Sequence, residues 1–220
     1  MRESASMAQE RQLHDASGFR FPSPDDVFQL RVSLVGITPS IWRRLLVPQD
    51  IPLPRFHRVL QVAMGWTDAH LHEFTVGDVR FGVPDAEFEP GPIDYRRITL
   101  NQIAPRKGAG CVYEYDFGDS WEHLIEVEDE LPADTVSARL PCCLAGERAC
   151  PPEDVGGAAG YAEFLAAFDD PSHPEHESWR RSMGPGFAPS EFDIDGVNAV
   201  LASLGARGRS AASRVPRRRQ

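Results

Sequence analysis

The sequence predicts an α+β protein, with a mixed sheet built from β-hairpins that flank one helix and a C-terminal layer of about three helices. Alternating apolar residues, which are typical of half-buried strands, recur through residues 25–131. One helical apolar stripe interrupts them, and further helical stripes fill residues 161–205. Because strands and helices do not alternate one by one, nothing supports a doubly wound nucleotide-binding sheet.

The strongest local signal is the stretch CVYEYDFGDSWEHLIEVE, from Cys111 to Glu128, which predicts two strands and a tight turn. We expect a three-residue loop, Gly118-Asp119-Ser120. The register that follows pairs Phe117 with Trp121, Tyr115 with His123, and Tyr113 with Ile125. Aromatic cross-strand pairs of this kind contribute about 0.2–1 kcal/mol each.

Two more hairpins are predicted on either side of the first helix. Residues 27–36 alternate along one strand, and residues 41–47 return after the break at Pro39. A second hairpin over residues 72–83 turns at Gly77-Asp78, which places His72 on its apolar face.

The first helix is predicted between Pro54 and Gly65, which suit its first turn and the position past its end. Its buried stripe comprises Phe56, Val59, Leu60, Ala63 and Met64. A Pro/Gly-rich excursion over residues 84–110 follows the second hairpin, and residues 98–103 within it form either a short strand or one helical turn.

The C-terminal part is predicted to be a Cys/Pro/Gly-rich loop over residues 132–160, followed by helices over residues 161–205. Expected capping pairs are Ser172 with Glu175 for the second helix and Ser190 with Asp193 for the third. The apolar stripes of the first and third helices are Tyr161, Phe164, Leu165 and Phe168, and Ile194, Val197, Leu201 and Leu204, the latter closed by Gly205.

Charge divides the chain into a loose leader (residues 1–24), one acidic domain (25–205) and a basic tail (206–220). We expect the leader and tail to be disordered, because neither carries a periodic apolar pattern. The net charge is −10, and the tail holds six arginines and no acid, so the remainder has a net charge of −16. Such a body disfavours a nucleic-acid-binding face. The tail arginines offer sequence-blind nucleic-acid binding instead: Arg207, Arg209, Arg214, Arg217, Arg218 and Arg219.

The expected compartment is the cytoplasm. No apolar run reaches the roughly 18 residues of a membrane span, and the N-terminus lacks the apolar core of a secretory signal. Four cysteines in 220 residues do not indicate a disulfide scaffold, so reduced thiols are expected. Met7 is an alternative start that the sequence leaves open.

An ordered series of segments resembles the plasmid pRiA4b ORF-3-like family. The segments are GITPSIWRRLLVP, FHRVLQVAMGWTDAHLHEF, YEYDFGDSWEH, CLAGERACPPEDVGG and GYAEFL, spread over about Val27 to Leu204. The resemblance implies an association with plasmids and transposable elements and brings no established activity. The serine-recombinase pattern is absent from the sequence, so a recombinase function is not carried over.

The resemblance also bears on a candidate zinc site. The family tends to place cysteines at the positions of Cys143, Cys150 and Val155, so this chain lacks the third. Structural zinc takes four Cys or His ligands, usually as two closely spaced pairs. The candidate ligands are Cys142, Cys143, Cys150, His173 and His176. The alternative is a proline-rich loop with buried thiols, because the ligand spacing matches no established zinc pattern.

A second candidate site combines His70, His72, Asp119 and His123, with His57 and Asp116 nearby in the pattern. These residue types suit a metal-dependent hydrolase or nuclease. The two strand histidines, His72 and His123, both lie on apolar strand faces, so they could meet where their hairpins adjoin. The alternative is that each is a core histidine with a hydrogen-bonded partner.

Three functional hypotheses follow. The first is a non-enzymatic binding or accessory module that contacts a protein partner through an acidic surface, with Trp66 and Trp121 as possible groove aromatics. The second is the metal-dependent hydrolase or nuclease, and the third is nucleic-acid binding by the tail. No cofactor is predicted, although zinc or another divalent metal is possible.

Overall fold

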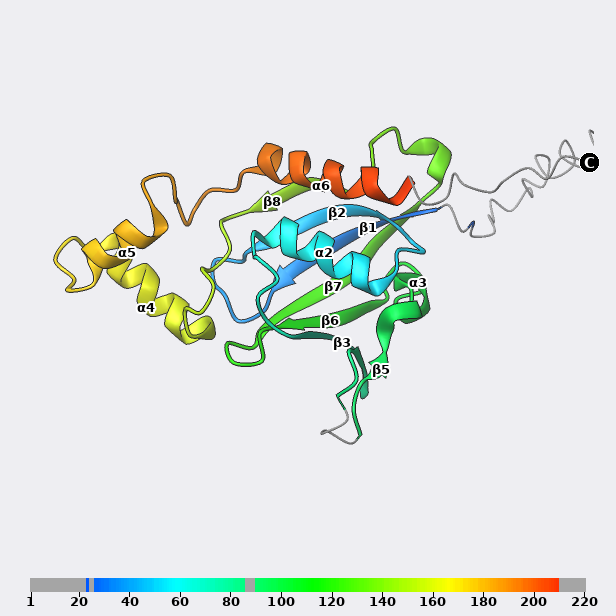
Figure 1. Ribbon diagram of the computed structural model, residues 1–220. Coiled ribbons are helices and arrows are strands. Elements are labelled where there is room, and N and C mark those ends of the chain that lie inside the picture. The colour runs from blue at the N-terminus through cyan, green and yellow to red at the C-terminus, as the bar shows by residue number, and fades with distance from the viewer. Residues whose placement is uncertain (1–22, 24–25, 86–89, 210–220) are drawn as a thin grey trace, which may run out of the picture.

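The computed structural model describes residue 23, residues 26–85 and residues 90–209, with side chains placed as far as residue 204 (Figure 1). The predicted α+β class is confirmed. The described strands are β1 (Val27–Leu34), β2 (Trp42–Pro48), β3 (His72–Val76), β4 (Val79–Gly82), β5 (Ile93–Asp94), β6 (Gly110–Tyr115), β7 (Trp121–Leu131) and β8 (Cys142–Glu147). The described helices are α2 (Leu53–Met64), α3 (Leu100–Ile103), α4 (Gly157–Asp169), α5 (His176–Met183) and α6 (Ile194–Arg209), with 3-10 turns η1 (Tyr95–Arg97) and η2 (Ala133–Thr135).

The strands form one sheet in the order β5-β4-β3-β6-β7-β1-β2-β8. All neighbours are antiparallel except β4 and β5, so the sheet is mixed, as predicted. The three predicted hairpins are β1–β2, β3–β4 and β6–β7. The central hairpin lies in the middle of the sheet, because β6 pairs with β3 while β7 pairs with β1.

The predicted register of the central hairpin was wrong by two residues. Tyr115 pairs with Trp121 and Tyr113 with His123, so the loop spans residues 116–120. The backbone N–H of Asp116 donates to Leu71 O on the adjoining segment instead of continuing the hairpin ladder. The N–H of Ser120 then closes the loop on Asp116 O at 2.6 Å.

The first helix carries the predicted stripe into the core. Phe56, Val59 and Leu60 are fully buried against the apolar face of the sheet. Pro54 stands in the first turn, and Gly65 ends the helix in the left-handed conformation with φ of 93°. Residues 98–103 contribute the helical turn α3, one of the two alternatives that the sequence left open.

The C-terminal part departs from prediction at β8, which lies inside the predicted loop and pairs with β2. The segment CCLAGE has no apolar alternation, so only its pairing with the exposed edge of β2 defines it as a strand. The capping pair Ser172–Glu175 is not formed, because Ser172 bonds Asp170 instead. Helix α6 is capped by Asp193, whose Oδ1 accepts from Gly196 N.

The predicted end of the last helix at Gly205 was also wrong, because α6 continues to Arg209. The first tail residues, including Arg207 and Arg209, are therefore helical in backbone. The other four tail arginines, Arg214, Arg217, Arg218 and Arg219, lie outside the described residues. The predicted leader lies outside them too, apart from residue 23.

Two helices cover one face of the sheet. Helices α2 and α6 lie side by side across it, whereas α4 and α5 form an arm beyond one end of the sheet (Figure 1). Within the described residues, no helix covers the opposite face. No described helix is long and apolar enough to cross a membrane.

Candidate functional site

Three loops from distant parts of the sequence converge at one end of the sheet: residues 65–71, 116–120 and 148–156. The hydroxyl of Tyr115, at the end of β6, connects two of them. It accepts from Ala69 N at 3.0 Å and donates toward Glu153 at 3.3 Å. Binding and catalytic residues are often carried by loops on a rigid scaffold, so this end of the sheet is a candidate location for a functional site.

The second and third loops also touch directly. Asp119 Oδ2 accepts from Gly156 N at 3.0 Å. A Cβ on Gly157 would lie 2.5 Å from Asp119 O, and Gly157 has a positive φ of 67°. Glycine is therefore required at this contact.

His70 lies at the centre of the loop cluster. Its Nε2 is 3.2 Å from Asp154 Oδ1, 3.6 Å from Asp116 Oδ2 and 3.7 Å from Glu153 Oε2. This nitrogen is buried and makes no hydrogen bond within the described structure. We name His70, Asp116 and Asp154 the His70 group, because their ligand atoms lie within 4.8 Å of one another.

Asp116 is held in place by its own loop. Its Oδ1 accepts from Gly118 N at 3.0 Å and from Asp119 N at 3.4 Å, which leaves Oδ2 directed at His70. Asp116 and Asp154 both adopt positive φ, 59° and 55°, a conformation that aspartate tolerates better than most residues. The loops therefore favour aspartate at both positions for backbone reasons as well.

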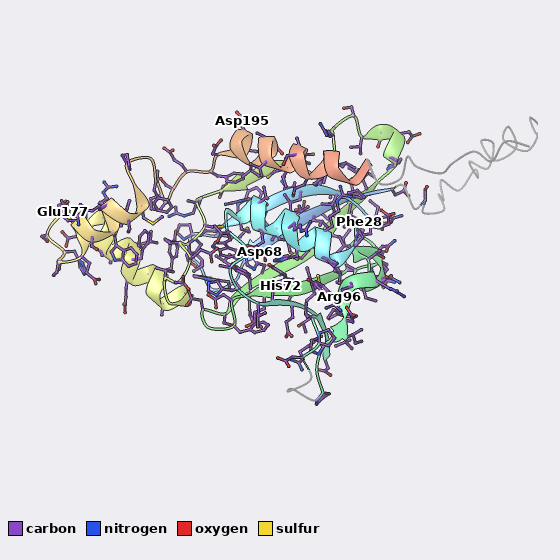
Figure 2. All side chains as sticks on the ribbon, in the orientation of Figure 1. Phe28, Asp68, His72, Arg96, Glu177 and Asp195 are labelled. Atoms are coloured by element: carbon purple, nitrogen blue, oxygen red, sulfur yellow. The ribbon has the colours of Figure 1, made fainter. Side chains whose placement is uncertain are left out.

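A second polar group lies between α2 and β3, next to α2 in Figure 2. His57 Nε2 is 2.8 Å from Asp68 Oδ1, and His57 Nδ1 is 2.8 Å from the Tyr113 hydroxyl. The rings of His57 and His72 stack in parallel, with centroids 3.5 Å apart and 5° between planes. His72 Nε2 lies 3.0 Å from the Tyr95 hydroxyl.

Burial favours the neutral form of both of these imidazoles. Desolvation, together with the neighbouring His57, lowers the pKa of His72 to about 4 against the opposing effect of Asp68. Desolvation also lowers the pKa of His57, against the opposing effect of Asp68. A neutral His57 that donates from Nε2 to the Asp68 carboxylate accepts the Tyr113 O–H at Nδ1, so one tautomer satisfies both contacts.

The stacked pair does not chelate an ion in this arrangement. The lone pairs of an imidazole lie in its ring plane, and the two planes are parallel and about 3.5 Å apart. An ion bound in the plane of one ring, at about 2.1 Å from its nitrogen, would therefore lie well outside the plane of the other ring. The lone pairs of that second ring would not point at the ion. Asp68, His57 and Tyr113 instead form a hydrogen-bonded network, completed by Gln61 Nε2 donating to Tyr113.

The structure separates the predicted set of His70, His72, Asp119 and His123. His123 is fully buried in the core, where its Nδ1 lies 3.1 Å from Tyr113 O. The two strand histidines do not meet, because β6 lies between their strands and the Tyr113 ring contacts both. Only His70 of the four belongs to the His70 group, and Asp119 bonds the third loop instead.

The cysteine-loop zinc site is not assembled either. Cys143 Sγ is directed to Ala145 O, and Cys150 Sγ accepts from Arg43. The other proposed ligands are His173, which accepts from Glu175 N, and His176, which lies 3.0 Å from Ala167 O at the end of α4. Within the described part of the chain, the two groups of closely spaced His and Asp side chains contain no cysteine, Cys142 included. The position of the absent family cysteine, Val155, is packed into the core.

The two tryptophans proposed as groove aromatics belong to the core. Trp66 is 7% exposed and donates to Pro151 O at 3.0 Å, and Trp121 is 2% exposed. Their ring centroids are 6.1 Å apart. They pack the protein rather than line a groove.

The uncovered face of the sheet is a second candidate surface, which we call the open face. Alternation along five strands directs polar and apolar side chains to it. These residues are Gln29, Arg31, Ser33, Trp42, Arg44, Glu73, Thr75, Val112, Glu114, Glu122, Leu124, Glu126 and Glu128.

The fold and the sites together define an α+β protein with a one-sided mixed sheet and a cluster of His and Asp side chains at one end. A family model described as plasmid pRiA4b ORF-3-like protein matches residues 26–196, so the chain belongs to this family. The resemblance noted in the sequence is thereby confirmed.

Two relatives extend the comparison. The uncharacterized protein y4hQ of Sinorhizobium fredii is 49% identical over 173 residues, which cover 78% of this chain and 86% of that protein. The crystal structure of MM3350 from Methanosarcina mazei Go1, a protein of unknown function, matches with a TM-score of 0.69 and 34% identity. That match covers 79% of this chain and 98% of MM3350. The first relative is described as uncharacterized and the second as a protein of unknown function.

Several site residues were absent from the predicted sets. Asp68, Glu153 and Asp154 lie in loops without a periodic pattern, and Tyr113 was predicted only as one of the cross-strand aromatic residues of the central hairpin. A possible signal was the acidic pair inside CPPEDVGG, where a Pro-rich and Gly-rich loop carries two adjacent carboxylates. Nothing in the sequence linked this acidic pair to His70, because the two loops meet only in the tertiary structure.

Proposed function

We propose that the protein is a binding or accessory module whose open face takes a basic protein partner. The supporting observation is the pattern of side chains across this face. An acidic row crosses three strands, because Glu73 lies opposite Glu114 and Glu114 lies opposite Glu122. An apolar row runs beside it, with Val112 opposite Leu124.

The acidic row is unfavourable for the fold itself. Like charges directly opposite each other on neighbouring strands destabilise a sheet. Burial, reinforced by the Glu114 carboxylate and opposed by Arg80, raises the pKa of Glu73. A positively charged partner would relieve this repulsion, which supports a role in binding.

The neighbouring row supplies the apolar contact. Leu124 is 41% exposed, and Trp42 lies across β1 from it, because Ser33 pairs with both. The guanidinium of Arg31 lies 4.3 Å from the centre of the Trp42 ring. An apolar centre between charged rims is the usual composition of a protein interface.

Charge reversal on the open face tests this proposal. A Glu122→Lys/Glu126→Lys variant changes two exposed strand residues, and a Glu163→Lys/Glu177→Lys variant makes the same charge change on the arm. Each protein is used as bait in host lysate, and a captured candidate is then purified and titrated against all three. We expect the open-face variant alone to weaken binding, by at least about tenfold.

If both variants lose binding affinity equally, the partner is attracted to net charge alone. If both variants bind as tightly as the wild type, the open face is not the binding surface. Either result overturns the proposal. Binding that weakens as salt is raised is expected as well, because exposed charges are screened.

The cellular location, the hydrolase hypothesis and nucleic-acid binding by the tail are separate from the open face. A cytoplasmic location belongs to the proposal and is compatible with the four unpaired thiols. The hydrolase or nuclease hypothesis depended on four residues that the fold separates, so it is not the function proposed here. Nucleic-acid binding by the tail depends on arginines mostly outside the described residues; deleting residues 206–220 should abolish any such binding.

A further inference from the structure

The His70 group has the geometry of a cation site. Carboxylate oxygens and imidazole nitrogens bind divalent metals at about 2.0–2.2 Å. Neighbouring ligands around one ion are therefore about 3.0 Å apart in an octahedron and about 3.4 Å apart in a tetrahedron. The spacings from His70 Nε2 to Asp154 (3.2 Å) and Asp116 (3.6 Å) fall near this range.

An ion pair of a protonated His70 explains the same residues less well. A charged imidazole hydrogen-bonds a carboxylate at about 2.7–2.9 Å. Here all three carboxylates approach one nitrogen, none within 3.0 Å, and the buried Nε2 has no hydrogen-bond partner in the described structure. A buried polar atom of this kind requires an explanation, and a shared ion supplies one.

The position of the carboxylates supports the same reading. Asp116 has a side chain that is only 10% exposed, and its Oδ2 is directed at His70 while Oδ1 holds the loop. Asp154 is 75% exposed and closes the group from the solvent side. Glu153 Oε1 accepts from Thr67 N at 2.8 Å, and its Oε2, which accepts from the Tyr115 hydroxyl at 3.3 Å, lies 3.7 Å from His70 Nε2.

We propose that His70, Asp116 and Asp154 bind one divalent first-row transition-metal ion, with Glu153 beside it. One imidazole nitrogen with two or three carboxylate oxygens is a borderline-to-hard donor set, which suits Mn²⁺ or Zn²⁺ rather than a thiolate-seeking metal. The ion ties the loops at residues 65–71, 116–120 and 148–156 together. This site is independent of the proposed partner on the open face.

Calorimetric titration of the full chain with Mn²⁺ alone and with Zn²⁺ alone tests the site. The protein is prepared without a metal-affinity tag and stripped with a chelator. We expect one equivalent of at least one of these ions to bind and to raise the thermal midpoint, because the ion binds the folded state.

Three variants assign the binding. His70→Ala removes the nitrogen, and Asp154→Asn removes a charge while asparagine keeps the left-handed backbone. Each should weaken binding at least about tenfold. Asp134→Asn, in η2, is the matched control and should bind as the wild type does.

Far-UV circular dichroism must show that all three variants are folded. Asp154→Asn should perturb the fold least, because the Asp154 side chain is largely exposed. The proposal is overturned if neither ion binds to the wild type. It is also overturned if binding survives unchanged in both His70→Ala and Asp154→Asn, which would place the ion elsewhere.

Discussion

The histidines on the apolar side of the sheet have structural rather than chemical environments. His123 has no exposed surface, and burial lowers its pKa to about 4. Its Nδ1 lies near Tyr113 O, and its Nε2 has no partner within the described residues. Strand alternation predicted this face correctly for His72 and His123. It did not predict the Tyr113 ring between them, which comes from a neighbouring strand.

His123 makes folding sensitive to acid. The unfolded pKa is about 6.5 and the folded value is about 4, so the unfolded state binds more protons between these values. The neutral form stabilises the fold fully above about pH 6.5, and this contribution is lost as pH falls toward 4. Its maximum is roughly 3 kcal/mol. We expect the free energy of unfolding to fall less between pH 7 and pH 5 in His123→Leu than in the wild type.

Urea unfolding at both pH values measures this difference, with His173→Gln in the arm as the control. His173 is not in the core and should leave the pH dependence unchanged. An identical loss in His123→Leu and the wild type would contradict the assignment.

At the scale of elements, a buried arginine joins α2, β2 and the end of β8. Arg43 is 1% exposed, and its hydrogen-bond acceptors within the described residues are backbone carbonyls and the Cys150 thiol, with no carboxylate among them. It donates to Ala63 O at 2.8 Å, Glu147 O at 2.9 Å and Arg148 O at 2.9 Å. Strand alternation directs Arg43 and Arg44 to opposite faces of the sheet, but the carbonyls that bind Arg43 come from distant elements.

The neighbouring arginines provide a matched test. Arg43→Lys keeps the charge but removes the planar donors, which leaves buried carbonyls without partners. We expect it to lower the free energy of unfolding by at least about 2 kcal/mol. Arg44→Lys changes a partly exposed pair with Glu128, so we expect a loss of less than about 1 kcal/mol.

Denaturant titration of both variants measures the two values. Losses of similar size would show that Arg43 does not join these elements. Of the three elements that Arg43 joins, the sequence predicted α2 and β2 but not β8. The carbonyls of Glu147, the last residue of β8, and of Arg148, which follows it, both accept from this arginine.

At the scale of the whole molecule, packing is uneven. The sheet, α2 and α4 contribute to one core cluster, which includes Phe28, Phe56 and Phe164. By contrast, α5 has no buried residue, although Trp179 packs edge-on against Phe164. Figure 2 shows Glu177 of α5 at the tip of the arm, away from the core.

This difference predicts local opening of the arm. Segments with few buried apolar contacts open with smaller free energies than the core. We expect amides of α5 to exchange with solvent at clearly lower opening free energies than those of β7, which lies in the centre of the sheet. Native-state hydrogen exchange with mass spectrometry measures both, and α5 protection equal to that of β7 would contradict this prediction.

The sequence alone determined the class, three hairpins and the α2 stripe, because alternation, turn residues and caps act over a few positions. Its ordered series of segments indicated the family by resemblance, which the family model confirms. Tertiary structure decided the register of β6–β7, the strand β8 and the assembly of the His70 group. Each of these depends on contacts between segments far apart in the sequence: Asp116 with Leu71, β8 with β2, and His70 with Asp154. Local pattern carries no information about such partners, since the free energy of each contact arises only once the sheet has formed.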